Sequence, residues 1–261
     1  MSSILKSGAA AIALAFAAAC VAAPAPASES AAVAAVDYAA IVDTPDRPDA
    51  DILSDHLRKP ADVLALFGPQ PGDTILEIEA GGGYYTELLS RIAGPTGKVY
   101  MQNPAGFDAF LGDAVKTRLE GRLNNVTYLK SNFDTFDVPD ASIDIATWFQ
   151  GPHEIWYTPD GASEALGNPD KSFKDIARAL KSGGQFVVID HVAPAGSPPT
   201  TGGDTHRIDP AHIRAMAEAA GFVLETESAV LHNPADDGLT NVFDPAIRGR
   251  TNQAVLIFRK P

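Results

Sequence analysis

Residues 74–89 read TILEIEAGGGYYTELL, and this stretch decides the fold. A short apolar run ends in three glycines, and an amphipathic segment follows at once. Strand, tight turn and helix in this order open a nucleotide-type α/β domain. Gly81 and Gly83 leave room for a ligand beside the backbone, the new helix offers free N–H groups, and Glu77 can accept a hydrogen bond. A turn that binds nothing is the alternative, because sharp turns also need glycine.

Two common nucleotide-binding motifs do not fit this stretch. A dinucleotide fingerprint needs a third glycine and an acid about 20 residues further on. Thr86 follows the glycines at the required spacing, and Asn103 ends the second predicted strand. Residues 94–98, GPTGK, resemble the tail of a P-loop, but Val99 replaces the Ser or Thr that such a loop requires. The sequence therefore argues against nicotinamide, flavin and P-loop sites.

Seven predicted strands alternate with helices until the last two strands, which follow one another directly. The strands are expected at residues 74–78, 98–102, 126–130, 142–149, 185–190, 222–230 and 254–259. Alternation predicts a parallel sheet with helices on both faces, and a terminal pair without a crossover is antiparallel. Apolar residues at helical spacing also predict one helix over residues 107–123.

The first 27 residues are typical of a secretory signal peptide. Lys6 precedes an uncharged run of small and apolar residues, and Ala25-Pro26-Ala27 forms an A-x-A cleavage site. We therefore expect export to the periplasm or cell envelope. Residues 28–50, rich in Ala, Pro, Ser and Asp, are predicted to be a linker or extended arm, and residues 51–261 to form the domain.

The single cysteine, Cys20, lies inside this predicted signal peptide. A mature domain without cysteine has no disulfide, catalytic thiol or thiolate-bound metal. Ala17-Ala18-Ala19-Cys20 also resembles a weak lipoprotein cleavage box, so a lipid anchor at Cys20 is the alternative to the A-x-A site.

The charge of the chain points away from nucleic acid as a partner. With 20 basic and 33 acidic side chains, the net charge of −13 repels phosphate backbones. No segment after the first is long and apolar enough to span a membrane. A small molecule is the expected partner, and nothing in the sequence indicates an oligomeric state.

Further motifs extend the pattern beyond the glycine loop. They are GGGYYTE at 81–87, GKVY at 97–100, QNP at 102–104, HE at 153–154, LKSGG at 180–184, VIDH at 188–191, HRID at 206–209, NP at 233–234 and VFDPAIRG at 242–249. With the strand pattern, they resemble class I S-adenosylmethionine-dependent methyltransferases, and more closely a family of exported bacterial proteins described as predicted methyltransferases. The resemblance covers about residues 50–261. It implies a Rossmann-like, seven-stranded sheet with an antiparallel last strand, and S-adenosylmethionine as cofactor.

The resemblance also implies a cofactor site along the carboxyl ends of the first four strands. The candidate cofactor ligands are Glu77, Glu79, Gly81, Gly83, Tyr84, Asn103, Asn132 and Phe133. The loop from Glu77 to Tyr84 would hold the methionine part. Asn103 stands where the family usually has an acid for the ribose hydroxyls. Asn132 and Phe133 fall in the adenine loop, where Asn132 replaces an Asp that is common in the family. Glu79 replaces the first glycine, and would either pair with the ammonium or sulfonium of the cofactor or repel its carboxylate.

Three histidines leave the predicted sheet at the same edge as the glycine loop. His153 follows the fourth strand, His191 ends the fifth, and His206 precedes the next helix; each has a carboxylate within three residues. We predict that they meet in one cleft as catalytic bases, because histidine titrates near neutrality. The set would also fit a divalent metal, but it lacks the two-histidine spacing of a helical site, so no metal ligand is assigned.

Two functions compete, and a third, a metal-assisted hydrolase on the same scaffold, is supported only by the number of His and Asp residues. The first is a methyltransferase that acts on a small-molecule or envelope acceptor, and the retained glycines and histidines favour it. The second is an exported, non-catalytic binding protein on a degenerate methyltransferase fold. Export favours the second, because the cofactor is made in the cytoplasm. Fold alone does not decide between them.

Overall fold

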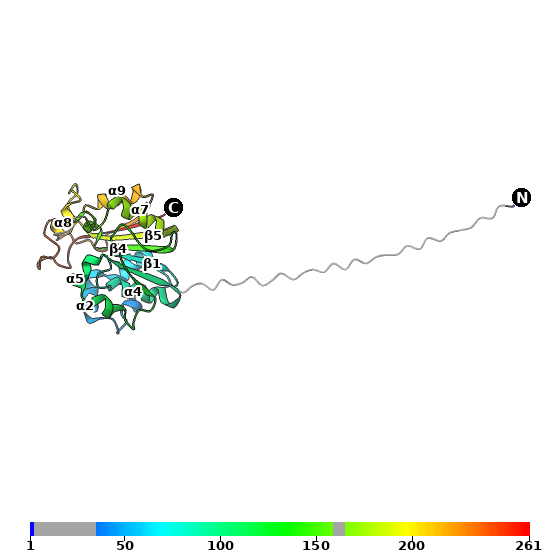
Figure 1. Ribbon diagram of the computed structural model, residues 1–261, viewed down its shortest axis with the longest axis horizontal. Coiled ribbons are helices and arrows are strands. Elements are labelled where there is room, and N and C mark those ends of the chain that lie inside the picture. The colour runs from blue at the N-terminus through cyan, green and yellow to red at the C-terminus, as the bar shows by residue number, and fades with distance from the viewer. Residues whose placement is uncertain (3–34, 159–164) are drawn as a thin grey trace. The chain divides into compact units, whose positions relative to one another are not determined.

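The computed structural model describes residues 1–2, 35–158 and 165–261 (Figure 1). Apart from its first two residues, the predicted signal peptide lies outside the described residues, as does Cys20. From Val36 to Pro261 the chain forms one compact unit. Among the described residues, no helix has the length and apolar character needed to cross a membrane.

In the described part of the chain, seven strands form one sheet in the order β3-β2-β1-β4-β5-β7-β6. The strands are β1 (Thr74–Ile78), β2 (Lys98–Asn103), β3 (Val126–Lys130), β4 (Ile143–Phe149), β5 (Leu180–His191), β6 (Val223–Ser228) and β7 (Gln253–Arg259). Strands β1 to β5 pair in parallel, whereas β7 runs antiparallel to both β5 and β6. This topology confirms the predicted methyltransferase-type sheet.

Helices lie on both faces of this sheet (Figure 1). The α-helices are α1 (Tyr38–Val42), α2 (Asp49–Arg58), α3 (Pro60–Phe67), α4 (Tyr84–Ala93), α5 (Asp108–Leu111), α6 (Ala114–Leu119), α7 (Pro169–Ala179), α8 (Thr201–Thr205) and α9 (Pro210–Ala219). The 3₁₀ turns are η1 (Gly94–Thr96), η2 (Ala105–Phe107) and η3 (Pro152–Trp156).

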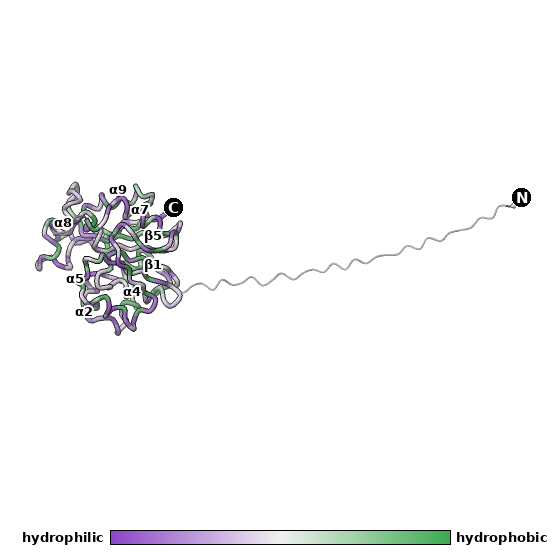
Figure 2. Tube along the Cα trace, viewed as in Figure 1, coloured by the Kyte–Doolittle hydropathy of each residue, from purple (hydrophilic) through white to green (hydrophobic). Residues whose placement is uncertain are grey.

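Successive strand residues point to opposite faces, so the sheet divides the core into two clusters. In β1, Leu76 and Ile78 belong to the cluster that α7 and α9 cover, whereas Ile75 belongs to the cluster that α3 and α4 cover. The hydrophobic residues of both clusters lie on the strands and on these covering helices, and Figure 2 colours the chain by hydropathy. Because both faces are buried, the polar ends of the strands are left to form a site.

Residues 36–50, predicted as linker, are part of the domain. Arg47 is buried, and its guanidinium donates to both carboxylate oxygens of Asp55 at 2.8 and 2.9 Å. The Tyr38 hydroxyl donates to the Pro69 carbonyl at 3.0 Å. The short α1 shows no lasting hydrophobic period, so the sequence pattern gave no sign of this packing.

The single helix predicted over residues 107–123 is wrong. Gly112 has a positive φ of 50°, which favours glycine, and separates α5 from α6. Its Cβ-free backbone permits this break at little cost. As a result Phe107 and Phe110 line a cavity at the sheet edge instead of joining one continuous helical face.

Candidate active site

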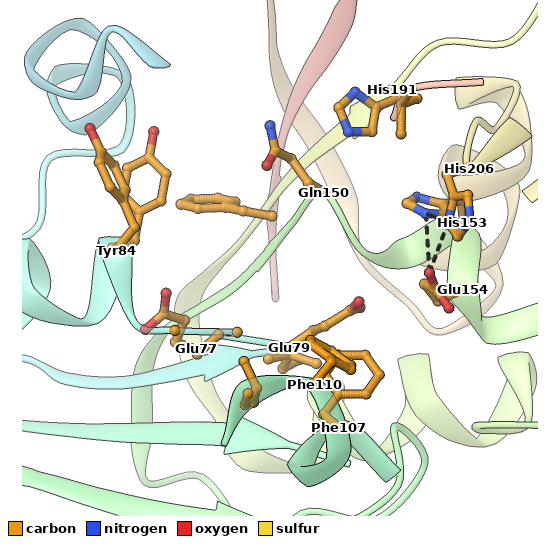
Figure 3. Close-up of a pocket in the computed structure, with 18 of the residues that line it drawn as sticks. Glu77, Glu79, Tyr84, Phe107, Phe110, Gln150, His153, Glu154, His191 and His206 are labelled. Carbon is orange, nitrogen blue, oxygen red and sulfur yellow. Dashed lines mark hydrogen bonds and ion pairs between the residues drawn. The ribbon is translucent and has the colours of Figure 1, made fainter. Parts of the chain in front are cut away.

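A cavity of about 940 Å³ opens at the carboxyl ends of the parallel strands. Figure 3 shows Glu77 and Tyr84 on one side of it and the histidines His153, His191 and His206 on the other. The parallel strands β1, β4 and β5 place these groups, because their carboxyl ends meet at one edge of the sheet. The predicted convergence of the glycine loop and the histidines is therefore present.

The glycine loop turns from β1 into α4. A Cβ added at Gly81 or Gly82 would meet nothing within 4 Å, and both residues line the cavity. Gly83 differs, because its φ is 83° and a Cβ there would lie 3.1 Å from Arg118 and 3.2 Å from Met101. Gly83 thus serves the turn and its packing, while Gly81 and Gly82 present the open backbone. Gly82 was not among the predicted cofactor ligands, although the run of three glycines includes it.

Two buried amides brace this loop. Asn103 accepts a hydrogen bond from the Gly81 N–H at 2.8 Å and donates one to the Gly81 carbonyl at 3.0 Å. Gln102 accepts from the Glu79 N–H at 3.0 Å. A carboxylate at 103 could only accept, so the amide suits a peptide group that needs both a donor and an acceptor.

The two predicted adenine-loop residues lie away from the cavity wall. Asn132 is exposed, and Phe133 is buried against Trp148 with ring centroids 5.2 Å apart. Phe107 and Phe110 line the cavity instead, and Phe110 is 68% exposed. These two residues were not predicted to line a site, because their helical spacing assigned them to the buried face of one helix.

Glu77, at the end of β1, is a buried carboxyl group. It accepts a hydrogen bond from the Thr86 hydroxyl. Burial raises the pKa of Glu77 to about 7. At neutral pH this group is therefore poised between its neutral and charged forms beside the glycine loop.

We expect Glu77 to make stability fall as the pH rises through about 7. Its pKa in the folded chain is raised from an ordinary 4.5, so its contribution is complete below that value and is lost above about 7. The free energy of unfolding is therefore lower above pH 7 than below pH 4.5 by about 3 kcal/mol. Urea unfolding at about pH 5 and pH 8 should show a smaller pH dependence for Glu77→Gln than for the wild type. Equal dependence in the two proteins would contradict this role.

Glu79 holds a strained position in the same turn. Its φ is 55°, in the left-handed region that favours glycine, which costs about 1–3 kcal/mol. Its carboxyl accepts a hydrogen bond from Trp148 Nε1 at 2.8 Å, and a Cβ on Gly151 would lie only 1.9 Å from it. Burial and the nearby Glu154 raise the pKa of Glu79 well above its usual range. Glu79 forms no close ion pair among the described residues, although the charge of His153 acts on it.

The histidine side of the cavity is a tightly connected group. His153 Nδ1 lies 2.7 Å from Asp190 Oδ1, and His153 Nε2 lies 3.3 Å from His206 Nδ1. His206 Nδ1 is also 3.0 Å from Glu154 Oε1. Burial alone would lower the pKa of His153, but Asp190 and Glu154 outweigh it and raise that pKa to about 10. For Glu154, burial is likewise outweighed, and His153 and His206 lower its pKa to about 2.

His191 and Asp209 behave differently from this group. Burial lowers the pKa of His191 to about 3, so its ring is neutral, and Nδ1 lies 2.7 Å from the Thr251 hydroxyl. Asp209, the acid nearest His206 in the sequence, instead caps α9 by accepting from the Ala211 N–H at 2.9 Å. Only two of the three neighbouring acids, Glu154 and Asp190, therefore join the histidines.

Several solved structures share this fold. A SAM-dependent methyltransferase from Aquifex aeolicus matches with a TM-score of 0.56 and 22% identity, over 86% of this chain and 99% of that one. Geranyl diphosphate C-methyltransferase from Streptomyces coelicolor A3(2) matches with a TM-score of 0.55 and 14% identity, over 85% and 87%. These similarities establish the fold.

Sequence relatives match about half of the chain. The ubiquinone/menaquinone biosynthesis C-methyltransferase UbiE of Hydrogenovibrio crunogenus is 29% identical over 130 residues, 49% of this chain and 46% of that protein. UbiE of Escherichia coli K12 is 27% identical over 136 residues, 52% and 49%. The chain thus spans about half the length of the curated relatives it matches.

The model of the ubiE/COQ5 methyltransferase family matches residues 50–198, more than half of the 261 residues. The matched region contains the glycine loop, His153 and His191, which all line the cavity. The resemblance to class I methyltransferases and the expectation of S-adenosylmethionine as cofactor are thereby confirmed at the level of the family. The chain belongs to the ubiE/COQ5 methyltransferase family, a family of S-adenosylmethionine-dependent enzymes.

Proposed function

We propose that this protein binds S-adenosylmethionine beside the glycine loop and transfers its methyl group to a small acceptor held by the histidines. One observation carries the proposal: a single cavity joins the open backbone of Gly81 and Gly82 to His153 and His206. Its volume of about 940 Å³ is at the upper end of small-molecule sites. It therefore suits a cofactor together with a second small molecule.

The residues of the cavity fit this cofactor. Bound S-adenosylmethionine supplies an electrophilic methyl group on a positively charged sulfur. Glu77 and Glu79 offer carboxyl groups to a ligand that carries an ammonium and a sulfonium. Arg58, which lines the cavity with its guanidinium 4.4 Å from the Tyr84 ring centre, is suited to the cofactor carboxylate.

The aromatic wall fits the adenine part. Phe107 and Phe110 lie 4.7 Å apart between ring centroids and face the cavity. Aromatic faces stack well on nucleobases. We therefore assign the adenine to this wall, and Asn103 a supporting role behind the loop.

The histidine side suits an acceptor with an acidic oxygen, such as a phenol or an enol. Asp190 orients the His153 ring, so Nε2 is directed toward His206. Because His153 is held in its charged form, this pair can stabilise the oxyanion of an acceptor whose hydroxyl proton has passed to solvent. The UbiE relatives are named as C-methyltransferases of quinone biosynthesis, which supports a hydroxylated ring as acceptor here.

Methyl-labelled cofactor tests this reaction. The full chain would be incubated with labelled S-adenosylmethionine and a panel of phenols, quinols and enols. We expect label in at least one acceptor, and a loss of about 10²–10⁴-fold in rate for His153→Asn, the usual contribution of a positioned acid or base. A native chain that binds the cofactor but labels no member of the panel would contradict the proposed acceptor class.

Glu79→Gln tests how the cavity receives the positive charge. We expect S-adenosylmethionine binding to weaken by about 1–3 kcal/mol, because glutamine cannot ionise to pair with the ammonium or sulfonium of the bound cofactor. S-adenosylhomocysteine, with a neutral sulfur, should lose less if Glu79 faces the sulfonium. Calorimetry would compare both ligands, with Glu225→Gln on the exposed surface as a charge-matched control. Tighter binding to Glu79→Gln would mean that Glu79 repels the cofactor carboxylate.

We also propose export to the periplasm or cell envelope, on the strength of Lys6, the apolar run and the A-x-A site. Mass spectrometry of envelope protein should find a chain that begins near Ser28. A lipid on Cys20 would keep export but add an anchor, and an intact cytosolic chain would refute export.

A further inference from the structure

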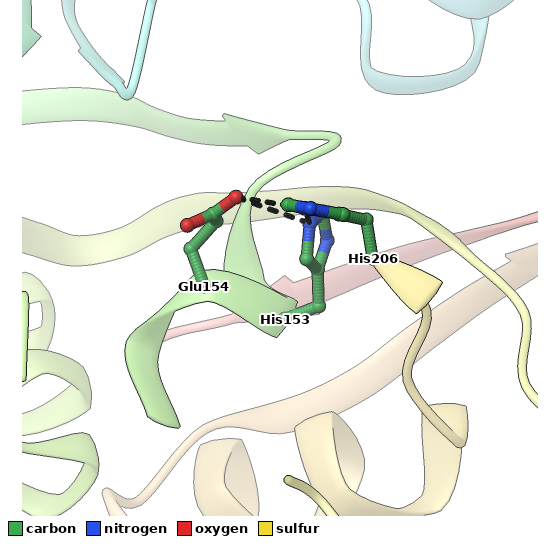
Figure 4. Close-up of side chains that lie close together, drawn as sticks. All are labelled: His153, Glu154 and His206. Carbon is green, nitrogen blue, oxygen red and sulfur yellow. Dashed lines mark hydrogen bonds and ion pairs between the residues drawn. The ribbon is translucent and has the colours of Figure 1, made fainter. Parts of the chain in front are cut away.

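Three atoms that are common metal ligands converge at the histidine side of the cavity. The distances are 3.3 Å from His153 Nε2 to His206 Nδ1, 3.0 Å from His206 Nδ1 to Glu154 Oε1, and 3.6 Å from His153 Nε2 to Glu154 Oε1. Figure 4 shows the three side chains turned toward one another. His153 and Glu154 are neighbours in η3, whereas His206 follows α8, so the fold alone brings them together.

These distances match the spacing of ligands around one small cation. Zinc binds imidazole nitrogen and carboxylate oxygen at about 2.0–2.2 Å. At angles between octahedral and tetrahedral, bonds of about 2.1 Å place the ligand atoms about 3.0–3.4 Å apart. The observed triangle, with sides of 3.0, 3.3 and 3.6 Å, lies close to that range.

The surroundings of His153 are those of a metal-bound histidine. Asp190 Oδ1 lies 2.7 Å from His153 Nδ1, which keeps a proton on Nδ1 and directs Nε2 toward the site, where a metal ion would displace the Nε2 proton. Asp190 is itself fixed, since it accepts hydrogen bonds from the backbone N–H groups of His153 and His191, each at 2.8 Å. A carboxylate that orients the ring from behind is typical of zinc and iron sites.

The backbone of His206 adopts an unfavourable conformation. Its φ is 55°, a left-handed conformation that is uncommon for a residue other than glycine. Such strain persists where the surrounding structure fixes it, often at a functional site. Here the neighbouring Arg207 is fully buried and ion-paired with Asp236, which anchors the segment that carries His206.

We propose that His153, Glu154 and His206 bind one divalent transition-metal ion whose remaining coordination positions face the cavity. Two imidazoles and one carboxylate are the ligand set of catalytic zinc and of non-haem iron sites. An oxyanion of the acceptor, its proton lost to solvent, would fill an open position. This last step rests on the proposed function, whereas binding of the metal does not.

The sequence favoured bases over a metal because the histidines are far apart in the chain. The remaining alternative is a metal-free cluster in which the same three side chains share protons. The two differ in a direct way, because only a metal site binds a cation at one equivalent through all three side chains.

Titration of the tag-free full chain with Zn²⁺ alone tests the proposal. Calorimetry should show one ion per chain for the wild type. His206→Ala and Glu154→Gln should each weaken Zn²⁺ binding at least about tenfold, and Asp190→Asn about 10–100-fold. His232→Ala is the matched control, because this exposed histidine bonds Asn252 outside the cavity and should leave the affinity unchanged.

Co²⁺ gives a second measurement that does not depend on heats. We expect its visible absorption to saturate at one equivalent with the wild type and to be lost in His206→Ala, while circular dichroism stays native. No Zn²⁺ binding to the folded wild type, or equal affinities in the cluster variants and the control, would overturn the proposal. The titrations contain no S-adenosylmethionine, so a chain that binds this cofactor but not Zn²⁺ refutes the metal site alone.

Discussion

Gly82→Val is expected to weaken S-adenosylmethionine binding about 100-fold while the fold stays native. Gly82 lines the cavity, its backbone is outside the left-handed region, and a Cβ there would meet nothing within 4 Å. Valine therefore fits the protein but fills space that the cofactor needs. Overfilling a packed site costs about 1–3 kcal/mol, and each 1.4 kcal/mol is about tenfold in affinity. Calorimetry measures the affinity, and thermal melting checks the fold.

Ala219→Val is the control for this variant. It adds the same kind of side chain at an exposed position of α9 that does not line the cavity, so cofactor binding should not change. Gly82→Ala should fall between the wild type and Gly82→Val. Normal affinity in Gly82→Val would show that the loop is only a turn. Gly83 is unsuited to this test, because a side chain there would strain the turn and press on Arg118.

Asp236→Ala should destabilise the domain by about 3–5 kcal/mol, the usual cost of leaving a buried charge unpaired. Asp236 and Arg207 have no exposed side-chain surface and are joined by hydrogen bonds of 2.7 and 2.9 Å. Arg207 also donates to the Thr240 carbonyl at 2.8 Å, so it holds the segment that brings Phe243 to the cavity. A loss of this size lowers Tm by about 10 °C in a domain of this length.

Glu225→Ala removes an exposed pair of the same type and serves as the control. Its carboxylate bonds Arg259 at 2.7 Å on the surface, where such pairs contribute about 0–1 kcal/mol. The double variant Arg207→Met/Asp236→Ala should recover part of the loss, because neither charge is then buried alone. If Asp236→Ala and the control Glu225→Ala have the same Tm, the buried pair does not hold this segment.

The sheet could be predicted from the sequence because its signals are local. Apolar runs such as residues 74–78 and 185–190 mark strands buried on both faces, and the three glycines mark the turn into α4. The break at Gly112 could not be predicted, since apolar spacing continues across it. Arg47 was equally hidden, because its partner Asp55 lies in α2, which the hydrophobic pattern did not reveal.

The site was predicted unevenly for a similar reason. The ends of parallel strands share one edge, so strand order alone placed Glu77, His153 and His191 together. The order of apolar and polar residues does not predict the direction in which a side chain points. Asn103 turns back to the Gly81 peptide, and Asp209 turns to the end of α9. Which acid meets which histidine depends on loop geometry that a single sequence does not give.

Calorimetric titration of the full wild-type chain with S-adenosylmethionine is the most direct test of the central claim, that one cavity holds this cofactor beside the glycine loop. The account predicts saturable binding at one molecule per chain, which Gly82→Val loses and Ala219→Val keeps. A folded wild-type chain that shows no binding, or that binds equally well in both variants, would contradict it.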